Sequence, residues 1–347
     1  MNTLKNFLGG IKEIPAGITW YLADIAESKG KQYLYTHQSP QKLKILRDHA
    51  LIESAVSSNR IEGVEIEKDR IEAVILSRPL LRDRNEEEVH GYRNVLQLIH
   101  ENTAAITFSQ ITVKRFHRMI RGDIWDAGKY KDKNSDIIER LPDGNVRVRF
   151  KTVPAAETSS AMRDLISYGG QLIRDEILHP LIVIAAINLD FLCIHPFRDG
   201  NGRVSRLMLL LQLYQAGYEV GRYISIERLI EEHKERYYET LELSSRRWHS
   251  GKHDPWPYVN FLLYILKKAY TELKERVNKL EIPKGGKTEL VISAIDTFKS
   301  DFTLSQLQSK CPEVSRDMIR KVMKDLQKDG KIESKGRGPG ARWRKKG

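Results

Sequence analysis

Residues 195–206 read His-Pro-Phe-Arg-Asp-Gly-Asn-Gly-Arg-Val-Ser-Arg and combine the residue types that bind phosphate. The turn Gly200, Asn201 and Gly202 precedes a periodic run that we expect to be a helix. Backbone N–H groups at a helix N-terminus lack intrahelical partners and carry the positive end of the helix dipole. Glycine lets an anion approach them closely, so the turn is predicted to cradle phosphate.

The side chains around this turn suggest matching roles. Arg203 and Arg206 are three residues apart on the expected helix, so their guanidinium groups share a face and could bind further phosphate oxygens. Asp199 could hold a nucleotide-bound Mg²⁺, which commonly takes one carboxylate besides phosphate oxygens and water. His195 could act as the general base toward a hydroxyl, because a neutral imidazole accepts protons near physiological pH. Phe197 is expected to anchor the loop to the core.

All eight specified positions match His-x-Phe-x-Asp/Glu-Gly-Asn-Gly-Arg-x-x-Arg, and the segment therefore resembles the Fic motif. Singly, each part is ordinary: a helix end, a surface turn or a solvated arginine pair. The resemblance implies a mainly helical Fic fold and transfer of AMP from ATP to a Ser, Thr or Tyr hydroxyl, with Mg²⁺ as cofactor. An enzyme of this kind that transfers phosphate, UMP or phosphocholine is the alternative. Gly202, where a Lys could stand at this motif position, favours AMP.

Residues 58–63, Ser-Asn-Arg-Ile-Glu-Gly, resemble the inhibitory motif of class II Fic proteins, Ser/Thr-x-x-x-Glu-Gly/Asn. Ser58 and Glu62 share a helical face, and Gly63 would let that helix end. If Glu62 pairs with Arg206, the guanidinium meant for the γ-phosphate is occupied and ATP binds unproductively. We therefore expect autoinhibition by Glu62, against the alternative of a solvated surface charge. Whether Glu62 also supports AMP removal stays open.

Two further segments resemble parts of Fic proteins. Residues 136–150 contain Leu-Pro-Asp-Gly-Asn followed by alternating valines and arginines, which predicts a β-hairpin. Together with Gly-Lys-Tyr-Lys at 128–131, it resembles the flap that holds the target segment by strand pairing, although a plain structural hairpin would look similar. Tyr237 and Tyr238 resemble the tyrosines that pack near adenine, with an ordinary core pair as the alternative.

The elements that must position these residues are mostly helices. Apolar residues recur at three- and four-residue spacing before residue 286, as at Val89, Tyr92, Leu96 and Ile99. The apolar run 181–194 is too short for a membrane span and is expected to be the central core helix.

The composition is that of an ordinary folded protein. At 347 residues the chain exceeds one usual domain, so two units are expected. Only Cys193 and Cys311 are present, which gives neither a disulfide framework nor a metal-ligand spacing. No export signal or membrane span is evident, and a cytoplasmic location is expected.

The sequence predicts four regions. Residues 1–75 form an N-terminal helical region with the inhibitory helix, and residues 76–280 form the Fic catalytic core. Pro283, Gly285 and Gly286 mark a linker over 281–287. Residues 288–347 are predicted to form a small winged helix-turn-helix domain.

The C-terminal region is basic. From residue 287 onward there are 15 Lys and Arg against 8 Asp and Glu, which is more than half of the net charge of +12. Its expected recognition helix places cationic residues opposite an apolar face, which favours DNA binding through counterion release. The cationic residues are Arg316, Arg320, Lys324 and Lys328, and the apolar ones are Met318, Ile319, Val322, Met323 and Leu326.

Other readings of this region and of the whole chain stay open. A protein contact would also explain the basic helix. The alternative outside enzymes is a transcriptional regulator that senses nucleotide through a Fic-like core. The target protein, which could be the chain itself, the oligomeric state and the role of residues 1–45 are also open.

Overall fold

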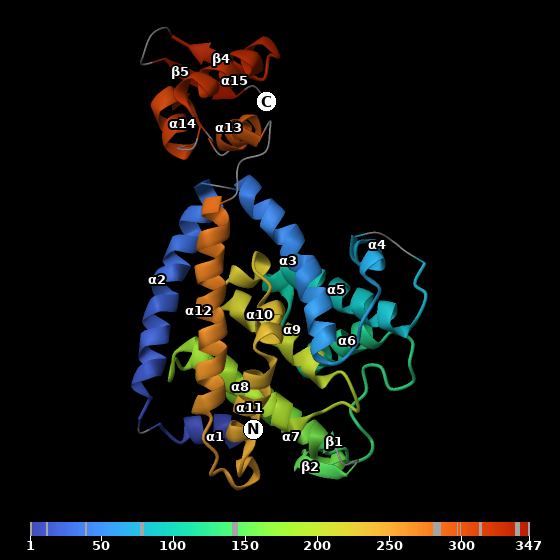
Figure 1. The fold of residues 1–347 in the computed structure, drawn as a ribbon. Helices are drawn as coiled ribbons and strands as arrows, with labels where there is room; N and C mark the ends of the chain where they lie inside the picture. The colour runs from blue at the N-terminus through green and yellow to red at the C-terminus, as the bar shows by residue number, and fades with distance from the viewer. Residues whose placement is uncertain are drawn as a thin grey trace. The chain divides into compact units, whose positions relative to one another are not determined.

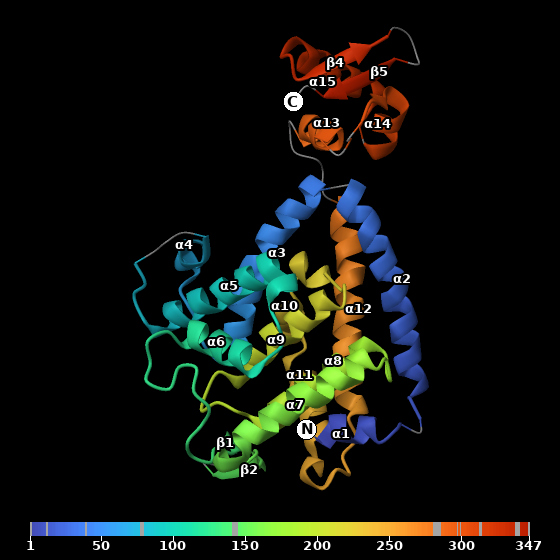
Figure 2. The ribbon, with the colours of Figure 1, turned by 180° about the vertical axis from the view of Figure 1, so that it is seen from behind.

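The computed structural model describes residues 2–11, 13–38, 40–76, 80–140, 145–279, 286–296, 298, 300–311, 314–336 and 341–345. The chain is mainly helical with two small sheets, which confirms the predicted fold class (Figures 1 and 2). It divides into two compact units, Met1–Glu27 with Asp48–Thr271 and Ser28–Arg47 with Glu272–Gly347. In the described part of the chain, no helix combines the length and apolar character that crossing a membrane requires.

The elements up to residue 279 belong mainly to the first unit, although α2, α3 and α12 extend into the second. The α-helices are α1 (Asn2–Leu8), α2 (Ala16–Gln38), α3 (Pro40–Ile61), α4 (Ile71–Leu76), α5 (Arg84–Asn102), α6 (Gln110–Arg121), α7 (Ala155–Arg174), α8 (Pro180–Ile194), α9 (Asn201–Gln215), α10 (Ile226–Glu232), α11 (Lys234–Ser245) and α12 (Trp256–Lys279). The strands are β1 (Ile137–Arg140) and β2 (Val146–Phe150), and the short 3₁₀ helices are η1 (Lys68–Arg70), η2 (Thr103–Ala105), η3 (Val220–Arg222) and η4 (Trp248–Ser250).

Helix α8 is the central core helix of this unit, as its apolar sequence predicts. It is buried on nearly every face and packs against α1, α7, α9 and α11. Its two polar side chains are hydrogen bonded, as buried polar groups must be. Asn188 Nδ2 donates to Ser205 O at 2.8 Å, and Asp190 accepts from the Thr3 hydroxyl at 2.6 Å. The polar residues in the run therefore fasten neighbouring elements to the core helix.

The predicted hairpin is present. Strands β1 and β2 pair antiparallel, with Ile138 opposite Val148 and Arg140 opposite Val146. The Asp-Gly turn predicted between them falls on residues 141–144, outside the described residues. Strand β2 is tied to α11, because Arg149 Nη2 donates to Tyr238 O at 3.0 Å.

The second unit contains α13 (Gly286–Asp296), β3 (Phe302–Thr303), α14 (Leu304–Lys310), α15 (Arg316–Lys328), β4 (Ile332–Lys335) and β5 (Arg342–Lys345). The strands form an antiparallel sheet in the order β3-β5-β4. Helix α13 begins at Gly286, inside the predicted linker 281–287, whose residues 281–285 lie outside the described part. The described residues of this unit thus hold the three helices α13, α14 and α15 and the paired strands β4 and β5, with β3 in addition. Strand β3 is too short to leave an alternating pattern in the sequence.

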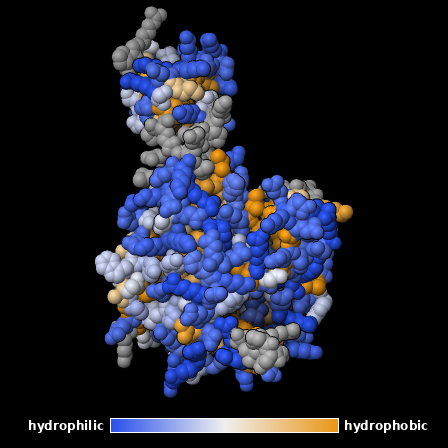
Figure 3. Space-filling model, in the orientation of Figure 1, coloured by the Kyte–Doolittle hydropathy of each residue, from blue (hydrophilic) through white to orange (hydrophobic). Residues whose placement is uncertain are grey.

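The second unit has its own apolar core, formed by residues such as Val291, Phe302, Leu307 and Ile319. On the face of the whole chain drawn in Figure 3, the surface is mostly hydrophilic and the hydrophobic residues form separate spots.

Candidate active site

The phosphate-cradle turn lies between α8 and α9. Helix α8 ends at Ile194, and His195 follows it in the left-handed region, with φ 52° and ψ 63°. Gly200 precedes α9 at φ 80°, a conformation that favours glycine. Helix α9 begins at Asn201, and its intrahelical bonding starts with the N–H of Val204 donating to Gly200 O. The N–H groups of Asn201, Gly202 and Arg203 therefore lie in the first turn, where intrahelical acceptors are lacking.

Asn201 and Phe197 fix the shape of this loop. The Asn201 side chain accepts from Phe197 N at 2.9 Å and donates to Phe197 O at 2.8 Å. Phe197 is fully buried, as expected for an anchor, and its ring stacks on His117 at 3.8 Å. The side chain of Asn201 thus closes the loop, which leaves only its backbone for a phosphate.

His117 holds the same loop from α6, and its role was not predicted from the sequence. The N–H of Gly128 donates to His117 Nδ1 at 2.8 Å, so the proton of the neutral His117 ring lies on Nε2. His117 Nε2 then donates to Asp199 O at 3.0 Å. Burial lowers the pKa of His117 to about 4, so the neutral ring with this tautomer is the stable form.

His195 is partly buried and borders a cavity of about 270 Å³. Burial disfavours the imidazolium form and the Lys131 ammonium adds to this, so the pKa of His195 is lowered to about 4. A neutral imidazole at pH 7 can accept a proton. Lys131 also contacts both neighbours of His195. The Lys131 Nζ lies 3.3 Å from Ile194 O, and the backbone N–H of Lys131 donates to Pro196 O at 2.9 Å.

Arg206 is held by the end of α3. Its Nε donates to Ser58 Oγ, while Nη2 donates to Ser58 O and to Glu62 Oε1, each at 2.8 Å. Its Nη1 is buried and has no hydrogen-bond partner among the described residues. The structure therefore brings together Ser58, Glu62 and Arg206. Gly63 follows at φ 80°, just beyond the end of the helix.

Glu62 also lies against the cradle. A Cβ atom added to Gly202 would lie 2.0 Å from Glu62 Oε1. The carboxylate therefore stands over the first turn of α9, where a phosphate would meet the free N–H groups.

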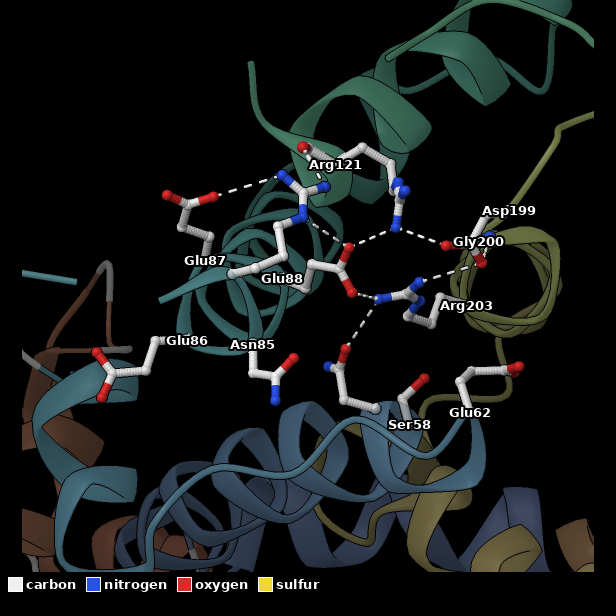
Figure 4. A network of polar contacts seen from close by, with 12 residues as sticks. Ser58, Glu62, Asn85, Glu86, Glu87, Glu88, Arg121, Asp199, Gly200 and Arg203 are labelled. Atoms are coloured by element: carbon white, nitrogen blue, oxygen red, sulfur yellow. Dashed lines mark hydrogen bonds and ion pairs between the residues drawn. The ribbon is translucent and has the colours of Figure 1, made fainter. Parts of the chain in front are cut away.

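The Arg203 guanidinium is buried, as that of Arg206 is, and its Nη2 lies 3.6 Å from Asp199 Oδ1 at the cradle. The Arg203 side chain is 2% exposed and donates to Glu88 of α5 and, at 3.3 Å, to Asn59 Oδ1. Glu88 is a buried carboxylate that accepts from Arg84, Arg121 and Arg203. Figure 4 shows its carboxylate between the guanidinium groups of Arg121 and Arg203.

Asp199 lies at the outer end of this network (Figure 4). Its Oδ2 lies 2.7 Å from Arg121 Nη1, and its Oδ1 accepts from Gly200 N at 2.5 Å. Burial would raise the pKa of its carboxyl, but Arg203 and Arg121 outweigh burial and lower it. Asp199 is thus an ionised carboxylate whose side chain is 56% exposed.

The described residues contain no group of three His, Cys, Asp or Glu side chains that could hold a metal ion by themselves. The Asp199 carboxylate at the cradle fits a different kind of site. A nucleotide-bound Mg²⁺ takes most of its ligands from phosphate and water and needs only one or two carboxylates.

The 270 Å³ cavity brings several predicted residues together. Glu62, His195, Gly202, Tyr237 and Tyr238 all line it. Its remaining lining is largely apolar, which suits a flat aromatic base. The apolar residues are Ile137, Phe150, Leu189, Leu192, Cys193 and Leu241.

The two tyrosines differ in their surroundings. Tyr237 is 3% exposed and packs against Phe261 in the core, with ring centroids 5.7 Å apart. Tyr238 is less buried, and its hydroxyl donates to Ile61 O at 3.3 Å. Tyr238 therefore connects the cavity wall to the last residue of α3, next to Glu62.

Comparison with known proteins gives consistent matches. Residues 107–213 match the model of the Fic/DOC family. Curated relatives include the "Protein adenylyltransferase Fic" of Drosophila persimilis, which is 24% identical over 254 residues, 70% of this chain and 44% of the relative. The protein of the same name from Nematostella vectensis is 26% identical over 171 residues, 46% of this chain and 37% of the relative. The matches thus span less than half of these relatives' length.

Two solved structures resemble this chain over most of its length. A Fic family protein from Desulfovibrio desulfuricans matches with a TM-score of 0.63 and 24% identity, covering 96% of this chain and 97% of that chain. A Fic domain containing signaling protein from Bacteroides thetaiotaomicron matches with a TM-score of 0.62 and 19% identity, covering 77% of this chain and 99% of that chain. At these identities the likeness establishes the fold alone.

Proposed function

We propose that this chain, which contains a Fic domain and has the Fic fold, is a protein adenylyltransferase that moves AMP from ATP to a protein hydroxyl. One observation carries the proposal: a neutral His195 borders the same cavity as Gly202 at the phosphate cradle and the Tyr237 and Tyr238 rings. The names of the curated relatives support transfer of AMP.

In the proposed reaction, the first-turn N–H groups of α9 and the Arg206 Nη2 that Glu62 holds at rest bind phosphate oxygens of ATP. His195 takes the proton of the target hydroxyl while the hydroxyl oxygen bonds to the α-phosphorus. The bond from that phosphorus to the bridging oxygen breaks, and pyrophosphate leaves with the electron pair. Mg²⁺, when bound, would neutralise phosphate charge, and Asp199 would hold it. His117 and Arg121 keep Asp199 in place.

In the resting state, we propose that Glu62 holds the enzyme off. The Glu62 carboxylate pairs with Arg206 and lies against Gly202. The phosphate groups of ATP therefore cannot bind the Arg206 guanidinium and the first-turn N–H groups of α9 at the same time. The pair is only partly exposed, at 3% for Arg206 and 29% for Glu62, so it is screened less than a surface pair. Removal of Glu62 should open the cradle without disturbing the catalytic loop.

The proposal can be tested with labelled ATP. Glu62→Gly should label a target protein or itself strongly, and wild type weakly. The double variant Glu62→Gly/His195→Ala should lose about 10²–10⁴-fold in rate, because proton transfer is removed. Glu65→Gly is the matched control, since Glu65 is an exposed carboxylate three residues further on. Undiminished labelling by the double variant would contradict the role of His195.

Transfer of a different group by the same site is the nearest alternative. Phosphate, UMP and phosphocholine transfer would each leave a distinct mass on the target. A non-enzymatic alternative is a nucleotide-sensing regulator, which would bind ATP in Glu62→Gly without turnover.

A second function is proposed for residues 286–345, namely DNA binding by a winged helix. The observation that favours it is α15, where Arg316, Arg320, Lys324 and Lys328 are exposed opposite the buried Ile319. DNA affinity should fall steeply with salt, as counterion release requires. Arg320→Glu/Lys324→Glu should weaken binding far more than Lys287→Glu, a reversal on α13. Binding that ignores salt and these reversals would argue for a protein partner.

A further inference from the structure

A second concave surface adjoins the candidate active site within the first unit. It is a shallow groove of about 610 Å³ between β2 and the segment from the end of α11 through η4. Glu242 is the one carboxylate among the described residues that line it. The cationic residues of this basic groove are Arg147, Arg149, Lys151, Arg246 and Arg247.

The charges in the basic groove are far from balanced. Glu242 is shared by three guanidinium groups, at 3.0 Å from Arg246, 3.1 Å from Arg149 and 3.7 Å from Arg147. Lys151 and Arg247 are exposed and form no ion pair with a carboxylate of the described chain. The side chains of Arg147 and Arg246 are 58% and 63% exposed, so their pairs with Glu242 are weak and exchangeable. The groove therefore presents unneutralised positive charge to an incoming partner.

The basic groove continues into the candidate active site. Arg149, Phe150, Glu242 and Ser245 line both the groove and the cavity that His195 borders. A polypeptide that places a hydroxyl at His195 thus has neighbouring residues within reach of the groove.

We propose that the basic groove binds an acidic segment of the protein target beside the hydroxyl that is modified. Aspartate and glutamate side chains match guanidinium forks in charge and geometry. A single-stranded nucleic acid held by base stacking would need exposed aromatic rings. Trp248 is buried and Phe150 stacks on His249 at 5.4 Å, so His249 is the one exposed aromatic ring among the described residues that line the groove. The inference rests on the proposed transfer reaction and adds a substrate preference to it.

The test uses the full chain carrying Glu62→Gly and two peptides with the same central hydroxyl residue. One peptide has aspartate and glutamate on either side, and the other has asparagine and glutamine at the same positions. Binding is measured by fluorescence anisotropy without nucleotide, and transfer as kcat/KM. The acidic peptide should be favoured about tenfold in both, as expected for a few partly exposed ion pairs, and the preference should shrink with salt.

Charge reversal identifies the surface responsible. Arg147→Glu/Arg246→Glu should abolish or invert the ratio between the two peptides, whereas Arg163→Glu, a reversal on an exposed position of α7, should leave it unchanged. Because the readout is a ratio within one variant, a general loss of activity does not imitate it. Thermal unfolding checks that each variant folds.

The outcomes separate the inference from the proposed function. Transfer to both peptides at equal kcat/KM would overturn the basic groove as an acidic-segment site and leave the transfer activity standing. Preferred binding of the acidic peptide without any AMP transfer would support the groove and contradict the enzyme. Competition by a single-stranded oligonucleotide that binds more tightly than the acidic peptide would overturn the inference in favour of nucleic acid.

Discussion

His195 combines an unusual backbone conformation with a lowered pKa. It is one of three non-glycine residues at positive φ in the described chain, with Glu176 and Arg247. Such a conformation costs about 1–3 kcal/mol and persists only where the surroundings enforce it. Lys131 helps to supply that enforcement, because it bonds to the carbonyl groups on both sides of His195. The same ammonium lowers the pKa of the imidazole.

The pH dependence of transfer follows from this. Transfer needs the neutral imidazole, so kcat/KM of Glu62→Gly should stay level from pH 8 to about pH 6 and fall only near pH 4, the lowered pKa of His195. An unperturbed imidazole would lose activity from about pH 6.5. Lys131→Met should move the acid limb to higher pH, because a positive charge that opposes protonation is removed. An acid limb that stays in place in Lys131→Met would contradict this assignment.

At the level of elements, the proposed autoinhibition depends on the end of α3. Gly63 has φ 80°, and an added Cβ would meet nothing within 4 Å, so the cost of a side chain there is conformational alone. Gly63→Ala should lower the free energy of unfolding by about 1–2 kcal/mol. It should also loosen the placement of Glu62 and raise AMP labelling to a level between wild type and Glu62→Gly.

Gly10→Ala is the control for this prediction. Gly10 has φ 96° and equally open surroundings, so the same backbone cost arises away from Arg206. It should lower stability without raising labelling. Equal labelling by the two variants would mean that lost stability, and not the position of Glu62, relieves inhibition.

The helices around the site were predicted from the sequence, but the start of one of them was not. The core helix before His195 and the helix after Gly202 were predicted, because an unbroken apolar run and a glycine turn are local signals. Helix α9 begins two residues earlier than expected, which puts Asn201 and Gly202 inside its first turn. Glycine and asparagine are weak helix formers, so propensity alone assigns them to the turn.

The residues that hold the loop could not be predicted from the sequence. Glu88, His117 and Arg121 contact the motif across 78 to 115 positions of sequence, so no periodicity links them to it. Glu88 sits in an acidic run whose neighbour Glu87 is exposed, and only the tertiary fold distinguishes the two. The ion pair between Arg203 and Glu88 could not be predicted for the same reason.

At the scale of the whole molecule, each of the two units has a hydrophobic core of its own. We expect calorimetry to resolve two unfolding transitions, one for each unit. Ile319→Ala in the second unit and Leu165→Ala in the first remove fully buried side chains, each at a cost of about 2–5 kcal/mol. Each substitution should lower the unfolding temperature of its own unit and leave that of the other unit unchanged. A single transition that both substitutions shift would contradict independent units.

The division into regions drawn from the sequence remains a proposal. In the structure, residues 1–27 and 48–75 pack in the same unit as residues 76–271 of the predicted catalytic core. Ser58 and Glu62 therefore belong to the unit that contains Arg206, which a boundary drawn at residue 75 does not convey. Composition and charge locate the basic C-terminal part, whereas the packing of an N-terminal helix depends on distant contacts.

The central claim is that Glu62 blocks a site otherwise complete for AMP transfer. The most direct measurement compares ATP labelled at the α-phosphorus with ATP labelled at the γ-phosphorus, using wild type, Glu62→Gly and Glu62→Gly/His195→Ala. If Glu62 blocks AMP transfer, Glu62→Gly alone should incorporate the α-label strongly, and no variant should incorporate the γ-label. Incorporation of the γ-label, or equal α-labelling by wild type and Glu62→Gly, would contradict it.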